Sequence, residues 1–198
     1  MKCWCFDNSI HTSTVHTGWY GRYRFGIDYL DLNLSKYFLT SIDQLPWKKL
    51  GYLDLHSNSL KGPLPIPPIG ISFLSSSRNN LSGMIPSLIS NISSLKFLDL
   101  SHDNLSDMIS SCPRNFGNNL SMLDLRNNKF YGTVLETFAK GNNLRSLNLN
   151  ENQLEGPLPQ SLVNCVHLEV LDLGNNKING IFPHWLGTLP NLRVLVLH

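Results

Sequence analysis

Residues 168–190 read LEVLDLGNNKINGIFPHWLGTLP and contain one complete copy of a pattern that recurs along the chain. Aliphatic residues or Phe fill the apolar positions of this copy, an Asn follows the third of them, and a Gly and a Pro close the motif. The fixed positions are Leu168, Leu171, Leu173, Asn176, Ile178, Gly180, Phe182 and Pro183. They define the frame LxxLxLxxNxLxGxLP. A pattern that recurs at a fixed period predicts that each copy folds into the same unit.

The same frame can be laid over the chain from Leu50 onward. Successive copies begin at Leu50, Ile71, Leu95, Leu120, Leu144, Leu168 and Leu192. Subtracting these numbers gives intervals of 21, 24, 25, 24, 24 and 24 residues. We therefore expect six repeats and an incomplete seventh over residues 50–198, a degenerate repeat over residues 27–49, and a non-repeat segment over residues 1–26.

Each copy predicts a short strand, a turn and a short helical segment. The LxxLxL portion places its leucines on one side of a strand, because side chains alternate with period two. Strands of successive copies are expected to pair in parallel, so that each repeat buries its apolar edge against its neighbours. The expected fold is a leucine-rich-repeat solenoid. We expect a right-handed superhelix of the α/β type, with a parallel β-sheet on its concave face and short 3-10 or helical turns on its convex face.

A polar column follows the strands, and we interpret it as structural. Its members are Asn58, Asn79, Asp103, Asn128, Asn152 and Asn176. An Asn amide can bond backbone groups of adjoining turns that would otherwise be buried without partners. Asp103 keeps the acceptor oxygens but lacks the amide donors. The same repeat carries Asp107 where others carry Gly, so we expect it to be the most irregular.

Charge and hydropathy exclude several classes of function. The formal net charge is +2, and the Lys and Arg residues are scattered, so no nucleic-acid partner is expected. No stretch approaches the roughly 18 apolar residues of a membrane-spanning helix, and residues 1–26 lack the apolar core of a signal peptide. The array stops at His198, directly after a strand, so we expect it to be truncated.

No catalytic, metal or cofactor site is predicted, and the chain is not expected to be an enzyme. Asp54, Asp99, Asp124 and Asp172 are expected to line one column of the exposed strand face, with Ser75 and Asn148 between them. A row of carboxylates is compatible with acid–base chemistry, but solvation of the sheet surface explains it as well. His56 and His102 fall in different columns two repeats apart, which argues against a shared metal.

The strand face offers a candidate binding surface for a protein or peptide ligand. The column before the second Leu begins with Tyr52, Phe73, Phe97 and Met122 and continues with Ser146, Val170 and Val194. Arg78, His102 and Arg126 flank it in other columns. An exposed apolar stripe often marks a partner surface. The alternative is that neighbouring side chains half cover this column and that it only packs.

Five Asn residues head N-x-Ser sequons, which are acceptor sites for N-glycosylation in secreted proteins. They are Asn33, Asn80, Asn91, Asn104 and Asn119. The chain is so rich in Asn and Ser that composition alone explains most of them.

Several blocks of residues resemble the extracellular arrays of plant receptor-like proteins related to Cf-type disease-resistance receptors. They are SLVNC at 161–165, LEVLDLGNNKI at 168–178, FPHWLG at 182–187, GPLPIPP at 62–68 and FAKGN at 138–142. The likeness covers about residues 47–198. It implies a ligand-recognition segment in defence or developmental signalling at the extracellular side of the plasma membrane.

The family's full-length members imply further parts and partners. These are a co-receptor kinase and a membrane helix, and the printed sequence contains no such helix. Two alternatives stay open at this point: a secreted leucine-rich-repeat inhibitor of a cell-wall-degrading enzyme, and a non-functional gene fragment.

Overall fold

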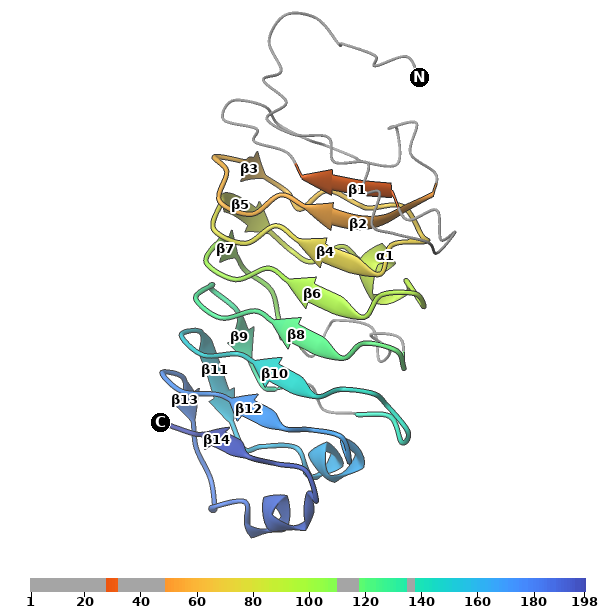
Figure 1. The fold of residues 1–198 in the computed structure, drawn as a ribbon. Helices are drawn as coiled ribbons and strands as arrows, with labels where there is room; N and C mark the ends of the chain where they lie inside the picture. Colours follow the sequence, from red (N-terminus) through yellow and green to blue (C-terminus); the bar gives the residue numbers. More distant parts are fainter. Residues whose placement is uncertain (1–27, 32–48, 110–117, 135–137) are drawn as a thin grey trace, which may run out of the picture.

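The computed structural model describes residues 28–31, 49–109, 118–134 and 138–198. Its main element is a large sheet in which eight strands stack one above another, all parallel (Figure 1). The strands are β1 (Asp28–Asp31), β2 (Leu50–Asp54), β4 (Phe73–Ser75), β6 (Phe97–Asp99), β8 (Met122–Asp124), β10 (Ser146–Asn148), β12 (Val170–Asp172) and β14 (Val194–Val196). The sheet contains one strand from each successive copy of the frame, which confirms the predicted leucine-rich-repeat fold.

The edge strand β1 lies inside the predicted degenerate repeat. It pairs with β2, and Leu30 stands opposite Leu53. The other residues of that repeat from 32 to 48, and the segment 1–26, lie outside the described residues.

Short helical turns lie on the flank where the large-sheet strands begin (Figure 1). They are the α-helix α1 (Ser87–Ser90) and the 3-10 helices η2 (Gln160–Asn164) and η3 (His184–Thr188). Each follows a Pro: Pro86, Pro159 and Pro183 respectively. A helical segment this short is held by packing rather than by its own hydrogen bonds. Ile89, Leu162 and Leu186 bury these turns against the core.

Two small sheets lie outside the large sheet, and the sequence did not predict them. The first contains β3 (Lys61–Gly62), β5 (Asn80–Gly83) and β7 (Asn104–Leu105), and the second contains β9 (Tyr131–Gly132), β11 (Gln153–Gly156) and β13 (Lys177–Ile178). Gly83 and Gly156 end their strands with φ of 88° and 79°, a backbone conformation that favours glycine. Asp107 replaces this Gly in its repeat and does not have a positive φ, so the backbone of that repeat differs from the others at this turn. Residues 110–117 of the same repeat lie outside the described part of the chain.

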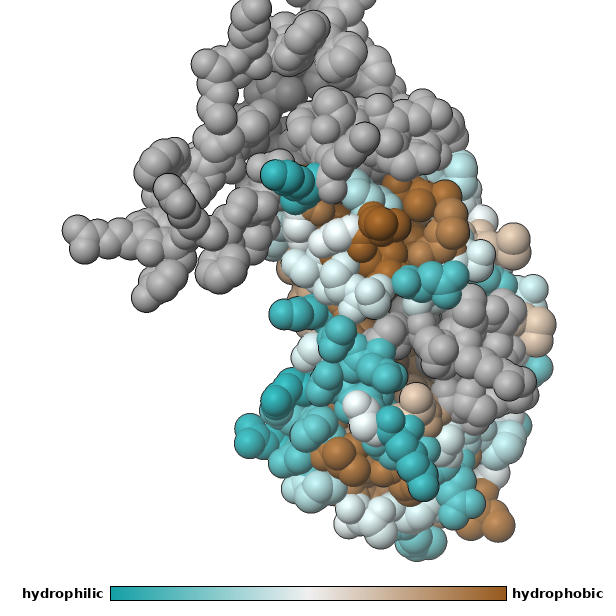
Figure 2. All heavy atoms as spheres, turned by 90° about the vertical axis from the view of Figure 1, so that its right-hand side faces the viewer, coloured by the Kyte–Doolittle hydropathy of each residue, from teal (hydrophilic) through white to brown (hydrophobic). Residues whose placement is uncertain are grey.

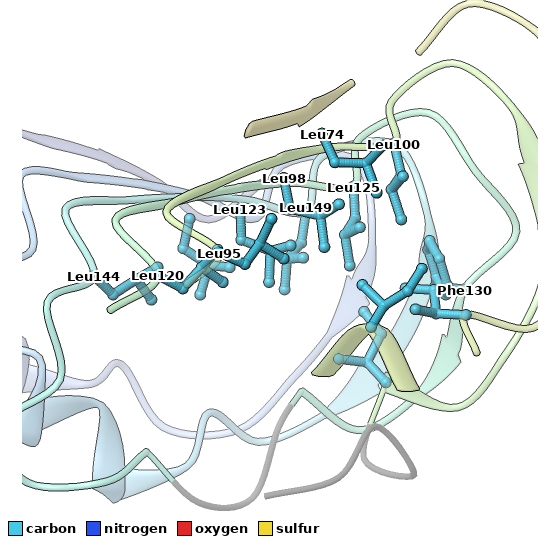
Figure 3. Packing of buried hydrophobic residues seen from close by; sticks show 14 of the residues in the cluster. Leu74, Leu95, Leu98, Leu100, Leu120, Leu123, Leu125, Phe130, Leu144 and Leu149 are labelled. Atoms are coloured by element: carbon cyan, nitrogen blue, oxygen red, sulfur yellow. The ribbon is translucent and has the colours of Figure 1, made fainter. Parts of the chain in front are cut away.

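The core consists of leucine rows that run along the stack. Leu53, Leu74, Leu98, Leu123, Leu147 and Leu171 are at most 1% exposed and align in register across the large sheet. Figure 3 shows leucines of successive repeats packed one behind another on the inner side of the strands. The neighbouring row has one polar member: Ser76 stands where the next repeats carry Leu100 and Leu125, and it is fully buried. Within the described part of the chain, its Oγ has no hydrogen-bond partner.

The Asn row, defined by the six residues of the polar column, joins each coil to the next. Its Asn members after Asn58 share one geometry, which Asn152 illustrates. The Asn152 Oδ1 accepts the N–H of Phe130 in the preceding coil at 3.0 Å. Its Nδ2 donates to the carbonyl oxygens of Leu125, Leu149 and Asn150 at 3.0 to 3.2 Å. One side chain thus supplies partners for four backbone groups at the turn.

Asn79, Asn128 and Asn176 repeat this geometry. Their Oδ1 atoms accept the N–H groups of Leu60, Leu105 and Leu154 at 3.0 Å. Each Nδ2 also donates to three carbonyl oxygens. The Nδ2 of Asn58, the first of the row, donates to the carbonyl oxygens of Leu55 and His56.

Asp103 occupies the same place without the donors. Its Oδ1 accepts the N–H of Leu81 at 2.8 Å, so its Oδ2 takes the position of the amide nitrogen in the other repeats. That oxygen is buried, and none of the described residues gives it a hydrogen bond. Burial raises the pKa of Asp103 from its ordinary value of 3.8 to about 7, and the nearby Asp99 carboxylate adds to the rise. A proton on Oδ2 can restore one donor where the other repeats have an amide.

We predict that Asn152→Ala lowers the free energy of unfolding by about 3 kcal/mol, because it leaves several buried backbone groups without partners at about 1–3 kcal/mol each. Urea denaturation followed by far-UV circular dichroism measures the change. Gln153→Ala, at the exposed neighbouring position, is the matched control and should change stability by less than about 0.5 kcal/mol. Equal effects of the two substitutions would contradict the role given to the Asn row.

We also predict that stability falls as pH rises from about 4 to 7, because the unfolded chain releases the Asp103 proton near pH 3.8 while the folded chain holds it until about pH 7. The difference between these two pKa values corresponds to a loss of up to about 4 kcal/mol. Asp103→Asn should remove the part of the loss that Asp103 causes and be the more stable form above pH 7. Urea midpoints of both proteins across this range measure the effect. If the difference between the two curves does not change with pH, Asp103 does not hold a proton in the fold.

Candidate ligand-recognition surface

The candidate surface is the outward face of the large sheet, and its central feature is a row of rings. Tyr52, Phe73, Phe97 and Met122 stand directly opposite one another on β2, β4, β6 and β8, and we call them the aromatic row. The Tyr52 and Phe73 rings stack with centroids 3.9 Å apart at 7°, and the Phe73 and Phe97 rings with centroids 4.3 Å apart at 9°. All four side chains are half-buried.

The stacking determines which parts of the rings a partner can contact. Because the inner ring faces cover one another, solvent meets mainly ring edges. The rings therefore pack on one another, and the row still reaches the surface. Its continuation through Ser146, Val170 and Val194 contains no ring.

A carboxylate row lies two residues further along the strands. Asp54, Ser75, Asp99, Asp124, Asn148 and Asp172 are aligned by the sheet register. The Oδ1 of each Asp accepts the backbone N–H of the residue two positions later, at 3.0 to 3.1 Å, and so does that of Asn148. The row thus caps the turns at the strand ends, a local pairing typical of Asp and Asn.

The expectation that the whole carboxylate row is exposed was wrong. Asp124 and Ser75 are each only 4% exposed. Neighbouring side chains cover this part of the face, and burial raises the pKa of Asp124. The row is therefore a structural cap with restricted access to solvent, rather than a free array of acids.

The flanking cationic residues occupy two adjacent rows. Arg78 and His102 belong to a row with left-handed backbone, together with Ser57, Asn127, Glu151 and Asn175 (φ 52° to 57°). Arg126 lies in the preceding row, with its Nε 3.4 Å from Asp124 Oδ2. Arg78 and Arg126 are exposed, and His102 is half-buried. The three residues lie beyond the carboxylate row, so the acids separate them from the rings.

A row of alternating charge was missed in the sequence. Arg145 Nη1 lies 2.8 Å from Glu169 Oε1, and Arg193 Nη1 lies 3.8 Å from Glu169 Oε2. These residues each follow the leading Leu of their repeat, so the period contained the signal. Exposed ion pairs of this kind contribute little to stability. They make the C-terminal part of the face polar, in contrast to the aromatic row.

The described sequons lie off the strands of the large sheet. Asn80 and Asn104 begin β5 and β7, and the Nδ2 of Asn104 donates to the Oδ1 of Asn80. Asn91 caps the C-terminus of α1, and Asn119 Nδ2 donates to the Ser93 carbonyl oxygen at 2.8 Å. Asn33 lies outside the described residues. A glycan at any of the four would leave the aromatic row uncovered at its point of attachment.

Apolar exposure alone does not single out a site. Ile69, Met84, Leu88 and Ile181 are all exposed and lie outside the large sheet. On the flank shown in Figure 2, hydrophobic residues gather near the N-terminal end of the array, and hydrophilic residues predominate below them. What distinguishes the aromatic row is its ordered stacking.

The described residues show no arrangement suited to metal or thiol chemistry. Across 28–31, 49–109, 118–134 and 138–198, no three His, Cys, Asp or Glu side chains gather to hold a metal ion. Cys165 is a free thiol buried in the core, and burial raises its pKa to about 11, so it is a poor nucleophile. Within the same part of the chain, no helix is long and apolar enough to cross a membrane.

Repeated coils with one parallel strand each, an Asn row and short 3-10 turns define a leucine-rich-repeat protein. Residues 158–198 match a sequence profile described as Leucine rich repeat, and residues 119–140 and 143–165 match a second. The chain is homologous to two receptor-like proteins of Arabidopsis thaliana. It is 43% identical to receptor-like protein 6 over 101 residues, which are 51% of this chain and 10% of that protein. It is 44% identical to receptor-like protein 7 over 61 residues, which are 31% of this chain and 6% of that protein. The chain thus matches a tenth or less of each relative's length.

Solved plant receptor structures have the same fold. The Arabidopsis receptor kinase HAESA, in complex with the peptide hormone IDA and the co-receptor SERK1, superposes with a TM-score of 0.72 and 30% identity over 86% of this chain and 29% of that one. The plant peptide hormone receptor RGFR1, in complex with RGF2, gives a TM-score of 0.64 and 26% identity over 75% of this chain and 28% of that one. The chain therefore resembles receptor ectodomains crystallised with peptide ligands.

Proposed function

We propose that the outward face of the large sheet, centred on the aromatic row, is a recognition surface for a protein or peptide ligand. Its contact residues are Tyr52, Phe73, Arg78, Phe97, His102, Met122 and Arg126. The segment acts within a plant cell-surface receptor-like protein, on the extracellular side of the plasma membrane, in defence or developmental signalling.

The observation that carries this proposal is the stacked triplet Tyr52–Phe73–Phe97 at the surface. Aromatic side chains are enriched among the residues that dominate binding energy at interfaces. Stacked neighbours also hold these rings in place, so a partner need not restrict their rotation, and binding loses less side-chain entropy.

The relatives support the receptor class and its kind of partner. The named homologues are receptor-like proteins, which favours a receptor over a secreted enzyme inhibitor. HAESA is solved with a peptide hormone and a co-receptor, so a peptide ligand and a co-receptor kinase are the partners we propose for the full-length protein.

We predict that Phe73→Ser and Phe97→Ser each weaken binding of surface-directed peptides at least about tenfold, because each removes a ring and its stacked support. The probes are random linear peptides selected by display on the wild-type chain and titrated by biolayer interferometry. Val170→Ser, in the same row on β12, is the matched control and should change affinity by less than about threefold. Unchanged affinity in both Phe variants, with wild-type urea midpoints, would remove the aromatic row from the binding surface.

A further inference from the structure

Asp99 differs from the other aspartates of the carboxylate row in its surroundings. Asp54 Oδ1 lies 2.8 Å from His56 Nδ1, and Asp124 Oδ2 lies 3.4 Å from Arg126 Nε. Asp172 accepts from Asn150 Nδ2 at 3.1 Å. For Asp99, the described part of the chain supplies the backbone N–H of Ser101 at 3.0 Å and no side-chain donor.

The periodicity shows where such a donor would stand. In two of the repeats the partner of the carboxylate is the residue two positions later, His56 or Arg126. The residue two positions after Asp99 is Ser101, which is 2% exposed and too short to reach out over the face. The repeat centred on β6 therefore keeps the acid of the pair and lacks the long side chain beside it.

Asp99 also lies beside a second carboxylate. Its neighbours across the sheet are Ser75 on β4 and Asp124 on β8. Burial raises the pKa of Asp124, and the Asp99 carboxylate adds to that rise, while Arg126 and His102 oppose it. Among the described residues, Arg78 in the repeat of β4 and Lys96 in the repeat of β6 are exposed cations. Neither forms an ion pair with Asp99 within 4 Å. A cation brought to Asp99 from outside would reduce this repulsion.

The aromatic row adjoins this acid. Phe97 precedes Asp99 by two residues on the same strand, a distance of about 6.6 Å along it. Phe97 is half-buried and stacks one ring face against Phe73, so that face is closed to a ligand, while the rest of the side chain can contact an aliphatic stem. A long side chain with an apolar stem and a cationic end fits this pair of neighbours.

We propose that Asp99 is the anchor for an arginine or lysine side chain of the partner protein or peptide, whose aliphatic stem lies over Phe97. This inference rests on the proposed function and adds the chemistry of its ligand. The partner's cation takes the place that Arg126 fills in the adjacent repeat of β8 and that His56 fills in the repeat of β2. Specificity then arises where the chain omits its own counterion, because a partner without a cation leaves Asp99 unpaired.

The test begins with random linear peptides selected on the wild-type chain and titrated against variants. The expected peptides contain Arg or Lys, and Asp99→Asn weakens their binding at least about tenfold. Ser101→Arg places a cation two residues after Asp99, as in the repeat of Asp124, and is expected to weaken binding to a similar extent by occupying the acid. Replacing the peptide's Arg or Lys by Gln should remove the difference between wild type and Asp99→Asn.

Two matched variants distinguish the effect of charge at Asp99 from the effect of a larger side chain at position 101 and from the loss of an acid elsewhere in the row. Ser101→Gln adds bulk without charge and should keep affinity within about threefold of wild type. Asp54→Asn removes an acid that already has His56 as its partner and should also have little effect. Urea midpoints verify that each variant folds, Ser101→Arg and Ser101→Gln in particular, because Ser101 is buried.

The outcomes distinguish this inference from the proposed function. If Phe97→Ser abolishes binding while Asp99→Asn leaves it within about threefold, the aromatic row binds the partner and the cation anchor is wrong. If the selected peptides contain no Arg or Lys, the cation anchor is likewise wrong. If no selected peptide depends on Phe73, Phe97 or Asp99, the recognition surface itself is wrong.

Discussion

The solenoid depends on the hydrogen bonds that each Asn of the Asn row makes to the coil before it. Asn128, Asn152 and Asn176 each accept one backbone N–H from the preceding coil and donate to carbonyl oxygens of both coils. A turn buried between two coils has no water to pair these groups, so the side chain must do so. These hydrogen bonds hold successive coils at one spacing. The alignment of the leucine rows, the large sheet and the candidate surface follows from that spacing.

The outward face of the sheet follows from the same spacing. Because consecutive strands keep one register, residues one repeat apart stand opposite each other, and similar residues form rows. Three rings at equivalent positions become a stack, and aspartates at equivalent positions become caps for successive turns. Departures from the pattern are then informative. Ser76 and Asp103 interrupt the core and the Asn row in adjacent repeats, and Ser101 leaves Asp99 without the side-chain partner present in the repeats that carry His56 and Arg126.

The sequence was sufficient for the fold class because the period specifies which residues share a row, and it placed Tyr52, Phe73, Phe97 and Met122 on one line. It could not give the exposure of that line. Side-chain packing between adjacent strands covers Asp124 and Ser75, and the stacking that covers the faces of Phe73 depends on rotamers. The two small sheets were missed because each of their strands contains at most one apolar residue, as in Lys61–Gly62 and Asn80–Gly83, so no alternation marks them in the sequence. That Asp99 lacks a side-chain partner among the described residues becomes visible only when it is compared with the pairs Asp54–His56 and Asp124–Arg126 in the structure.

The role of the Asn row in joining the coils can be measured by hydrogen exchange of the N–H groups that bond to it. The amides of Leu60, Leu105, Phe130 and Leu154 should exchange among the slowest in the chain, because each opens only when two coils separate. The Leu81 amide, bonded to Asp103, should lose protection relative to these four as pH rises through 7. If the four amides exchange at rates close to those of an unstructured peptide, in a chain that keeps its folded circular dichroism, the Asn row does not hold the coils together.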